Sequence, residues 1–229
     1  MIGPLDMAGV AALVGDPARA TMLAALMDGR ALTATELALD AGVSPQTASG
    51  HLGKLVDAHL LTVLKQGRHR YHRLASPLIG RMLEGIMAVA AIEAPPRHRP
   101  RSARDDAMCF ARTCYDHLAG RLGVALADAL VERGVVQLDD DGGQVTAEGR
   151  RFLDDFGIGD DAARARRNAF CRPCLDWSER RWHLGGRLGV DLARRCLDLG
   201  WIERRRDSRA VILTPKGRSG FEDRFGVVL

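Results

Sequence analysis

Between residues 31 and 74 the spacing of apolar side chains predicts two short helices followed by a β-hairpin. Leu37 and Ala38 give the first helix an inward face, and Leu52 and Leu55, three residues apart, give one to the second. The outward positions of the second helix carry short polar side chains. Such an order of elements is typical of a small domain that presents its second helix to a partner.

The boundary between the two helices carries capping residues and a glycine. Thr33 or Thr35 can cap the first helix, and Gly42 supplies the left-handed conformation where the chain turns. Ser44 can cap the second helix, and Pro45 fits its first position because no N–H is needed there. The pattern therefore predicts a helix-turn-helix.

The predicted hairpin is basic at its tip. Its strands are residues 61–64 and 71–74, and between them Gly67 favours a turn among three cations. A helix-turn-helix followed by a basic hairpin is a winged helix-turn-helix. In that arrangement one helix enters the major groove of DNA, and the wing lies over the backbone.

Short polar side chains at the early positions of the second helix can reach base edges and phosphates without steric blockage. We expect the cations beyond them to hold phosphate. The predicted DNA-binding residues are Ser44, Gln46, Thr47, Ser49, His51, Lys54, Arg68, His69 and Arg70. Two symmetric recognition helices require an inverted-repeat operator on double-stranded DNA, with half-sites about one helical turn apart.

From about Asp16 to Leu74 the chain resembles the ArsR-type (ArsR/SmtB) bacterial winged-helix repressors. The resemblance rests on the helix start Asp-Pro-Ala-Arg at residues 16–19, on the segment TELALDAGVSPQTASGHLGKLVDAHLL and on the basic wing. It covers roughly the first 95 residues. It implies a homodimer that represses an operator and releases it when an effector binds.

The metal sites of that family do not transfer to this sequence. Where many metal-sensing relatives carry thiolates before the turn, this chain has Thr33 and Thr35, which are not soft ligands. Other relatives bind zinc on the dimerisation helix, but here residues 77–93 contain no histidine and only Glu84 and Glu93 as acidic residues.

That helix instead predicts a dimer interface. Its apolar residues recur at i, i+3 and i+4, and the face they form is wider than one domain can cover alone. The residues of the face are Leu78, Ile79, Met82, Leu83, Ile86 and Met87. We predict a homodimer through this helix and residues 1–14.

The whole chain has the composition of an ordinary globular protein, 46% hydrophobic and 27% charged. No apolar run approaches the ~18 residues that span a bilayer, and the N-terminus lacks the basic segment of a signal peptide. We therefore expect a cytoplasmic protein with no membrane partner. The sequence lacks a nucleophile elbow, a phosphate-binding loop and an HExxH helix, so we do not expect an enzyme.

The length of 229 residues favours two domains, and a Pro/Arg-rich stretch at residues 95–105 predicts the linker between them. The net charge is +4, but residues 1–95 balance at eight basic and eight acidic residues. The positive charge is therefore local, at the wing tip and in the linker. We predict a DNA-binding and dimerisation domain over residues 1–94 and a second domain over residues 106–229.

The second domain repeats itself, at about residues 109–157 and 171–226. Each copy has a cysteine, the segment His-Leu-Ala/Gly-Gly-Arg-Leu-Gly-Val, an amphipathic helix, a hairpin and a last helix, an order that resembles the tail of a winged helix. The expected fold class is mainly α with short β-hairpin wings (α+β). In it, tandem winged-helix-like repeats form a sensor-like module behind the winged helix-turn-helix.

All five cysteines lie beyond the linker, and four form pairs at the start of the repeats, with spacings Cys-x4-Cys and Cys-x2-Cys. In a cytosolic protein such pairs favour metal binding or thiol redox chemistry over structural disulfides. One helical turn between Cys114 and His117 would let both face one centre. The candidate ligands of zinc or another thiophilic metal are Cys109, Cys114, His117, Cys171, Cys174 and His183. We expect Cys196 to be a packing residue.

Aromatic and basic residues of the second repeat leave an alternative open. Trp177, Arg180, Arg181 and Trp182 can line a pocket for a flat or anionic organic ligand, including heme. More often, tryptophans of this kind anchor an interface between repeats. The weakest alternative is Cys/His enzyme chemistry fused to a DNA-binding domain.

Overall fold

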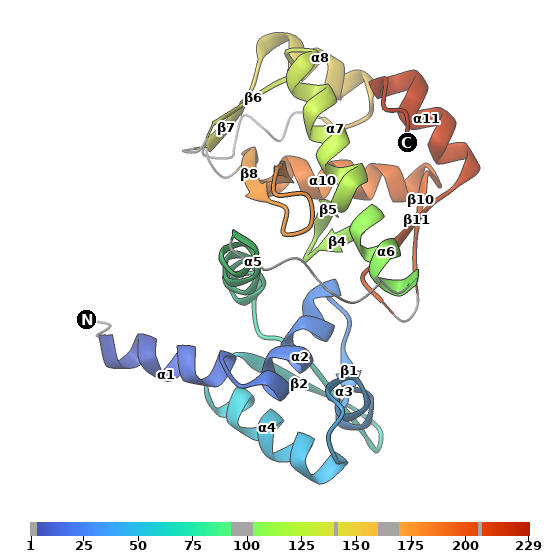
Figure 1. Cartoon of the computed structure of the whole chain (residues 1–229). Helices are drawn as coiled ribbons and strands as arrows, with labels where there is room; N and C mark the ends of the chain where they lie inside the picture. The colour runs from blue at the N-terminus through green and yellow to red at the C-terminus, as the bar shows by residue number, and fades with distance from the viewer. Residues whose placement is uncertain (1–3, 93–102, 140–141, 160–169, 206–207) are drawn as a thin grey trace. The chain divides into compact units, whose positions relative to one another are not determined.

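The computed structural model describes residues 4–92, 103–139, 142–159, 170–205 and 208–229 (Figure 1). Its contacts divide the chain into unit 1, Met1–Gly85, and unit 2, Ile86–Leu229, so the division falls inside one helix. Residues 95–102 of the predicted linker lie outside the described residues, and its last three residues, 103–105, form the start of a helix. No helix in the described part is long and apolar enough to cross a membrane.

Unit 1 is a helical domain with one small antiparallel sheet, in the strand order β1-β3-β2. Its elements are α1 (Pro4–Val14), α2 (Pro17–Ala25), the 3-10 helix η1 (Leu26–Asp28), β1 (Leu32–Thr33), α3 (Ala34–Ala41), α4 (Pro45–Asp57), β2 (Leu61–Gln66), β3 (His69–Leu74) and the first part of α5 (Pro77–Ile92). This order confirms the predicted winged helix-turn-helix.

The predicted caps hold the turn between α3 and α4. Thr33 caps α3 in a reciprocal capping box, in which its hydroxyl accepts from the Glu36 N–H and the Glu36 carboxylate accepts from the Thr33 N–H. Gly42 ends α3 in the left-handed conformation, at φ 65°. Ser44 accepts from the Thr47 N–H and starts α4, with Pro45 in its first turn.

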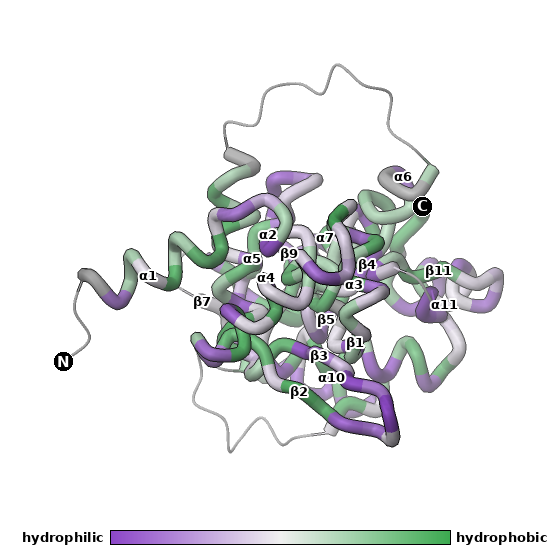
Figure 2. Tube along the Cα trace, turned by 90° about the horizontal axis from the view of Figure 1, so that it is seen from below, coloured by the Kyte–Doolittle hydropathy of each residue, from purple (hydrophilic) through white to green (hydrophobic). Residues whose placement is uncertain are grey.

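The wing is longer than the sequence pattern predicts. β2 and β3 pair in register from Leu61 opposite Leu74 to Gln66 opposite His69, which leaves a two-residue turn. Gly67 adopts φ 58° in that turn, a conformation that favours glycine. Figure 2 shows that the tip of this hairpin is hydrophilic, whereas much of α1 and α5 is hydrophobic.

Unit 2 contains the rest of α5 and the two repeats, each a hairpin, a helix, a second hairpin and a second helix (Figure 1). After α6 (Ala103–Phe110), the first repeat is β4 (Arg112–Cys114), β5 (His117–Ala119), α7 (Gly120–Glu132), β6 (Val136–Asp139), β7 (Gly142–Val145) and α8 (Ala147–Asp155). The second is β8 (Arg172–Leu175), β9 (Trp182–Gly185), α10 (Gly186–Asp198), β10 (Ile202–Arg204), β11 (Val211–Leu213) and α11 (Pro215–Phe225).

The first hairpin of each repeat corrects the expectation of a helical turn between Cys114 and His117. These two residues are instead directly opposite each other on β4 and β5. Tyr115 in the intervening turn has φ 56°, which a right-handed helix does not contain. Cys114 and His117 therefore share a centre because they are cross-strand neighbours.

The two repeats interlock through these hairpins. β9 of the second repeat packs on α7 of the first, and β5 of the first packs on α10 of the second. One continuous core from both repeats joins them, with Leu122, Leu130, Leu188 and Phe221 at no more than 1% exposure. Burial of this kind stabilises the folded state by roughly 1.5–3 kcal/mol for each large side chain.

Candidate functional site

The exposed side of α4 is the first candidate site. Ala48, Leu52 and Leu55 are buried against the rest of unit 1, which turns Gln46 and Ser49 to the surface. Thr47 is also exposed, but its hydroxyl lies 2.8 Å from that of Ser44. The Ser49 hydroxyl donates to the carbonyl of Pro45 at 2.9 Å. Among these side chains, the amide of Gln46 best matches the paired donor and acceptor of a base edge.

His51 differs from its neighbours on α4 because it is held beside α2. Its Nδ1 lies 3.2 Å from a guanidinium nitrogen of Arg19 and 3.9 Å from the carboxylate of Asp16. The ring is half-buried, so His51 lies at the edge of the exposed surface. Its predicted contact with bases stays a prediction.

Basic side chains extend from α4 to the wing. Lys54 of α4 is exposed, as are Lys65, Arg68, His69 and Arg70 around the hairpin turn. Cations on a narrow hairpin can follow the phosphates of a duplex. The helix and the wing together form the surface predicted to bind DNA.

A compact cluster of cysteine and histidine side chains in unit 2 is the second candidate site. The cluster consists of Cys114, His117, Cys174 and His183, whose potential ligand atoms all lie within 4.8 Å of one another. The exposed fraction is 5% for Cys114, 2% for His117 and 0% for His183, while Cys174 is half-buried. Each repeat supplies one thiol and one imidazole.

The same strand register builds both halves of the cluster. Cys114 lies opposite His117 on β4 and β5, and Cys174 lies opposite His183 on β8 and β9. Opposite residues of an antiparallel pair hold their Cβ atoms about 4.5–5.5 Å apart, which suits two ligands of one ion. Across the repeats, the two imidazoles also lie close together, since Nε2 of His117 is 3.1 Å from Nε2 of His183.

Carboxylates lie beside both imidazoles. An Asp116 oxygen is within hydrogen-bond distance of Nδ1 of His117, at 3.0 Å, which leaves Nε2 of His117 for the centre of the cluster, as is found around metal-binding histidines. An Asp176 oxygen lies 3.4 Å from Nδ1 of His183 but makes no hydrogen bond with it. Neither aspartate was among the predicted site residues, although both follow a cluster cysteine in the repeated pattern Cys-x-Asp.

Asp176 is itself fixed by a buried network. It pairs with Arg112 at 2.8 Å, both side chains are fully buried, and it accepts from the N–H of Gly120. Although burial alone raises the pKa of Asp176, the Arg112 charge and the hydrogen bonds from Ser178, Arg112 and Gly120 hold it well below its usual range. Asp176 therefore stays ionised beside His183.

The electrostatics of the cluster favour a neutral imidazole at His183, the form that can bind a cation. Burial, together with the neighbouring His117, lowers the pKa of His183 well below its usual range, so its ring is neutral. The adjacent Cys174 thiol and burial raise the pKa of Cys114 well above its usual value. A raised pKa favours the protonated thiol of Cys114. A bound cation would instead favour the thiolate, because a coordinated thiol loses its proton.

The donor set fits a tetrahedral ion. Two nitrogens bound to zinc at their usual distance are about 3.3 Å apart at the tetrahedral angle. The observed separation of 3.1 Å between the two Nε2 atoms is close to that value. Two soft thiolates with two imidazoles suit zinc or another thiophilic metal.

The other three cysteines lie outside this group among the described residues. Cys109 is 3% exposed on α6, and Cys171 and Cys196 are fully buried in the core of unit 2. Burial raises the pKa of Cys171 and of Cys196 to about 12. The structure therefore brings together four of the six predicted ligands and leaves Cys109 and Cys171 out, because tertiary packing overrides sequence spacing.

Three of the four residues predicted for an organic-ligand pocket line one groove, and the fourth lies elsewhere. Arg180, Arg181 and Trp182 line a groove of about 570 Å³ with the apolar side chains of Val131 and Leu175. Arg181 pairs with Asp128, which also lines the groove, at 2.8 Å. Trp177 is not among the residues that line the groove. Its ring instead packs against Arg112, whose guanidinium lies 4.4 Å from the ring centre. This tryptophan anchors the interface between the repeats.

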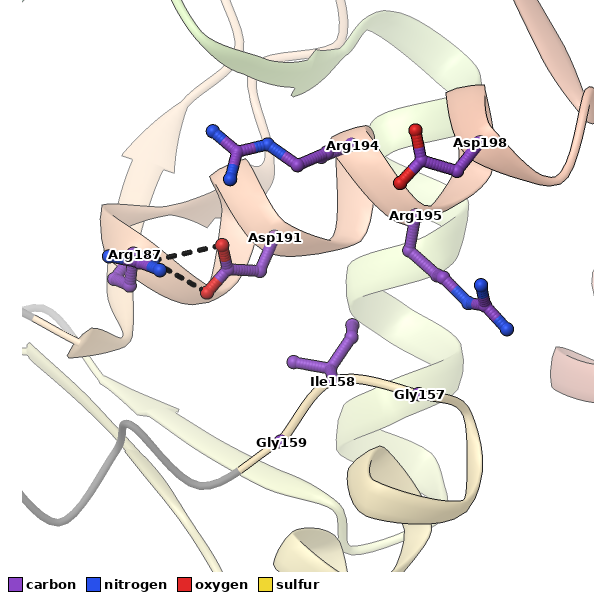
Figure 3. Close-up of a pocket in the computed structure, with 8 residues that line it drawn as sticks. All are labelled: Gly157, Ile158, Gly159, Arg187, Asp191, Arg194, Arg195 and Asp198. Atoms are coloured by element: carbon purple, nitrogen blue, oxygen red, sulfur yellow. Dashed lines mark hydrogen bonds and ion pairs between the residues drawn. The ribbon is translucent and has the colours of Figure 1, made fainter.

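A second cavity, of about 490 Å³, lies between α10 and the segment Gly157–Gly159 (Figure 3). Its charged side chains are largely committed to structural contacts. Arg187 makes two hydrogen bonds to Asp191, and Arg195 donates to the Phe156 carbonyl at 2.9 Å. We assign no ligand to it.

Comparison with known proteins agrees with the helix-turn-helix of unit 1. Residues 14–63 match the family model of the helix-turn-helix domain HTH_20. Over 222 residues the chain is 43% identical to the uncharacterized HTH-type transcriptional regulator YdfF of Bacillus subtilis (strain 168), an alignment that covers 97% of this chain and 98% of that protein.

Two similar solved structures are smaller. The homodimeric winged helix-turn-helix domain of a possible ArsR-family regulator from Mycobacterium bovis is 22% identical, with a TM-score of 0.37, over 42% of this chain and 88% of that one. The cadmium sensor CMTR of Mycobacterium tuberculosis is 28% identical, with a TM-score of 0.32, over 42% of this chain and 97% of that one. With its winged helix-turn-helix fold and its similarity to YdfF along nearly the whole chain, this protein belongs to the HTH-type transcriptional regulators.

Proposed function

We propose that this regulator is a homodimeric cytoplasmic repressor that binds an inverted-repeat operator, and that a thiophilic metal ion in unit 2 controls its affinity for DNA. The observation that carries the effector part is the cluster of Cys114, His117, Cys174 and His183. Because its ligands come from both repeats, the ion changes how the repeats are held together. An effector of this kind acts only if it binds one state of the protein better than another.

The metal site is tested on protein purified under reducing conditions. We expect one zinc-type ion per chain by elemental analysis, and loss of that ion in a Cys114→Ser/Cys174→Ser variant. The matched control is Cys171→Ala/Cys196→Ala, which removes two cysteines outside the cluster and should keep the ion. Operator titrations with and without a chelator then measure the control of DNA affinity. Equal metal content in the two double variants would contradict the proposal.

Base recognition by α4 is tested with Gln46→Ala. Because its amide can pair with a base edge, we expect a loss of about 1–3 kcal/mol on the best operator and weaker discrimination among operator variants. Arg70→Ala on the wing is the comparison, since a phosphate contact carries no sequence information. It should weaken all sequences alike and lower the salt slope by about one. Unchanged discrimination after Gln46→Ala would show that another residue reads the base.

Dimer formation is tested on the exposed apolar face of α5. This face includes Leu78, Ile86 and Val89, which are 62%, 46% and 68% exposed. Exposed apolar surface is unfavourable in water, and packing against a second copy of the chain would bury it. Ile86→Glu should sediment as a monomer at micromolar concentration and lose the operator, because it places a charge in the interface. Ile212→Glu on β11 is the matched control, at the same 46% exposure, and should stay dimeric. If the Ile86→Glu variant remained dimeric, the dimer interface would not lie on this face of α5.

The groove beside Trp182 supports a second candidate, a small organic effector. Its volume of about 570 Å³ is within the range of ligand sites, and Trp182 directly precedes His183 of the cluster. A ligand there would act on the same hairpin. Titration of heme and aromatic acids into wild type and Trp182→Ala, followed by operator binding, separates this candidate from the metal.

A further inference from the structure

We infer that Cys114 and Cys174 are a redox pair, in which a hydroperoxide joins the two metal-bound thiolates in a disulfide and expels the ion. The inference rests on the proposed metal site and names the signal that this site receives. The bound ion controls DNA affinity, as proposed above, and the oxidant is the signal that removes it. The regulator would then respond to peroxide stress through unit 2, with no thiol in its DNA-binding unit.

The closed shape of the cluster indicates a resident ion. Four protein ligands complete a tetrahedral shell and leave no open position for substrate or water, as in structural zinc sites. Three of the four ligands are at most 5% exposed. Two thiolates also neutralise a divalent cation, so the buried complex carries no net charge. Such a site releases its ion when a ligand is chemically altered.

The exposure of the ligands shows where an oxidant enters. Cys174 is half-buried on β8, whereas Cys114, His117 and His183 are buried. Cys174 is therefore the least buried of the four residues, and we expect solvent-borne peroxide to reach its thiolate first. Cys114 lies behind it as the resolving thiol, and the two sulfurs are at most 4.8 Å apart. A disulfide needs a sulfur separation of about 2.05 Å, so the hairpins must close by under ~3 Å.

The reaction balances with one hydroperoxide. The Cys174 thiolate attacks the terminal peroxide oxygen, the O–O bond breaks, and the departing alkoxide takes a proton from water to leave as an alcohol. The resulting sulfenic acid is a poor ligand, and the Cys114 thiolate attacks its sulfur. The S–O bond breaks, hydroxide leaves and takes a second proton, and the S–S bond forms. The thiolates lose two electrons, the peroxide gains them, and the metal keeps only two imidazoles.

The remaining cysteines provide internal controls. Cys109, Cys171 and Cys196 are buried and lie outside the cluster among the described residues. Buried thiols in apolar surroundings are poorly accessible to oxidants and react slowly. We therefore expect a single disulfide, between β4 of the first repeat and β8 of the second.

The experiment uses the full chain, loaded with one equivalent of zinc and treated with hydrogen peroxide. We expect release of one zinc per chain to a chromophoric chelator, loss of two thiols and a Cys114–Cys174 disulfide by peptide mapping. Operator affinity should change by about 5-fold or more, the lower end of allosteric coupling. A dithiol reductant with zinc should restore all three readouts.

Two variants sharpen the test. Cys174→Ser should lose the response to peroxide, and Cys196→Ala should keep it in full. Zinc retained under peroxide, or a disulfide that leaves out Cys114 or Cys174, would overturn the inference while leaving the metal site intact. A reduced protein that binds no zinc would overturn the metal site itself.

Discussion

Replacement of Arg112 by methionine should destabilise unit 2 by about 3–5 kcal/mol, because it leaves a buried carboxylate without its counter-charge. Arg112 and Asp176 are both fully buried and 2.8 Å apart. Arg112 also donates to the Met108 carbonyl and the Ser178 hydroxyl. The free energy of unfolding can be measured in urea by tryptophan fluorescence, since all three tryptophans lie in residues 106–229.

Arg181→Met is the control for this prediction. Arg181 pairs with Asp128 at the same 2.8 Å, but the two side chains are 62% and 35% exposed. Exposed pairs contribute about 0–1 kcal/mol, so this variant should unfold nearly like wild type. The double variant Arg112→Met/Asp176→Asn should recover part of the loss, because it removes the unpaired charge. Equal small losses for Arg112→Met and Arg181→Met would show that the buried pair contributes no more than a surface one.

The winged helix-turn-helix was predictable because its determinants are local. Thr33, Gly42, Ser44 and Pro45 each act within one helical turn of their own position, through a cap, a left-handed residue or a missing N–H. The hairpin required only alternation and a glycine. The repeat order of unit 2 was equally legible, since both copies keep the same apolar spacing.

The Cys/His cluster of unit 2 was predicted only in part, because the choice of its members is a tertiary effect. Cys114 and Cys174 are 60 positions apart, and no spacing rule pairs them. Sequence spacing groups each with its nearest cysteine, Cys109 or Cys171, and both of these neighbours are buried outside the cluster. The correct grouping depends on how the first hairpins of the two repeats interlock.

Residues with unusual backbone conformations explain why the helical turn expected between Cys114 and His117 was wrong. Tyr115 and Arg180 adopt φ 56° and 55° in the turns of β4–β5 and β8–β9. Neither is glycine, asparagine or aspartate, so sequence carries no signal for these turns. Trp177 instead has the interface role that the sequence left open as an alternative, since its contact with Arg112 joins residues from different repeats.

Gly189→Ala should destabilise unit 2 by about 3 kcal/mol and weaken zinc binding by on the order of 10-fold, the usual scale for a displaced metal-site support. A Cβ on Gly189 of α10 would lie 2.1 Å from the Leu184 carbonyl oxygen and 3.1 Å from the Cβ of His117. Either α10 or β9 must therefore move, and β5 must yield at His117; β9 and β5 each carry a histidine of the cluster. Alanine's better helix propensity, about 1 kcal/mol, is too small to offset this overlap.

The symmetric variant and an open position test the same argument. Gly123→Ala in α7 would place its Cβ 2.6 Å from the Leu118 carbonyl oxygen and 3.7 Å from the His183 Cβ, so it should cost less stability and less zinc affinity than Gly189→Ala. Gly159→Ala meets nothing within 4 Å and should be neutral or slightly stabilising. Urea unfolding and competition with a zinc chelator give both quantities for each variant. If Gly189→Ala unfolds like Gly159→Ala and keeps its zinc, close approach of the repeats at these glycines does not position the histidines.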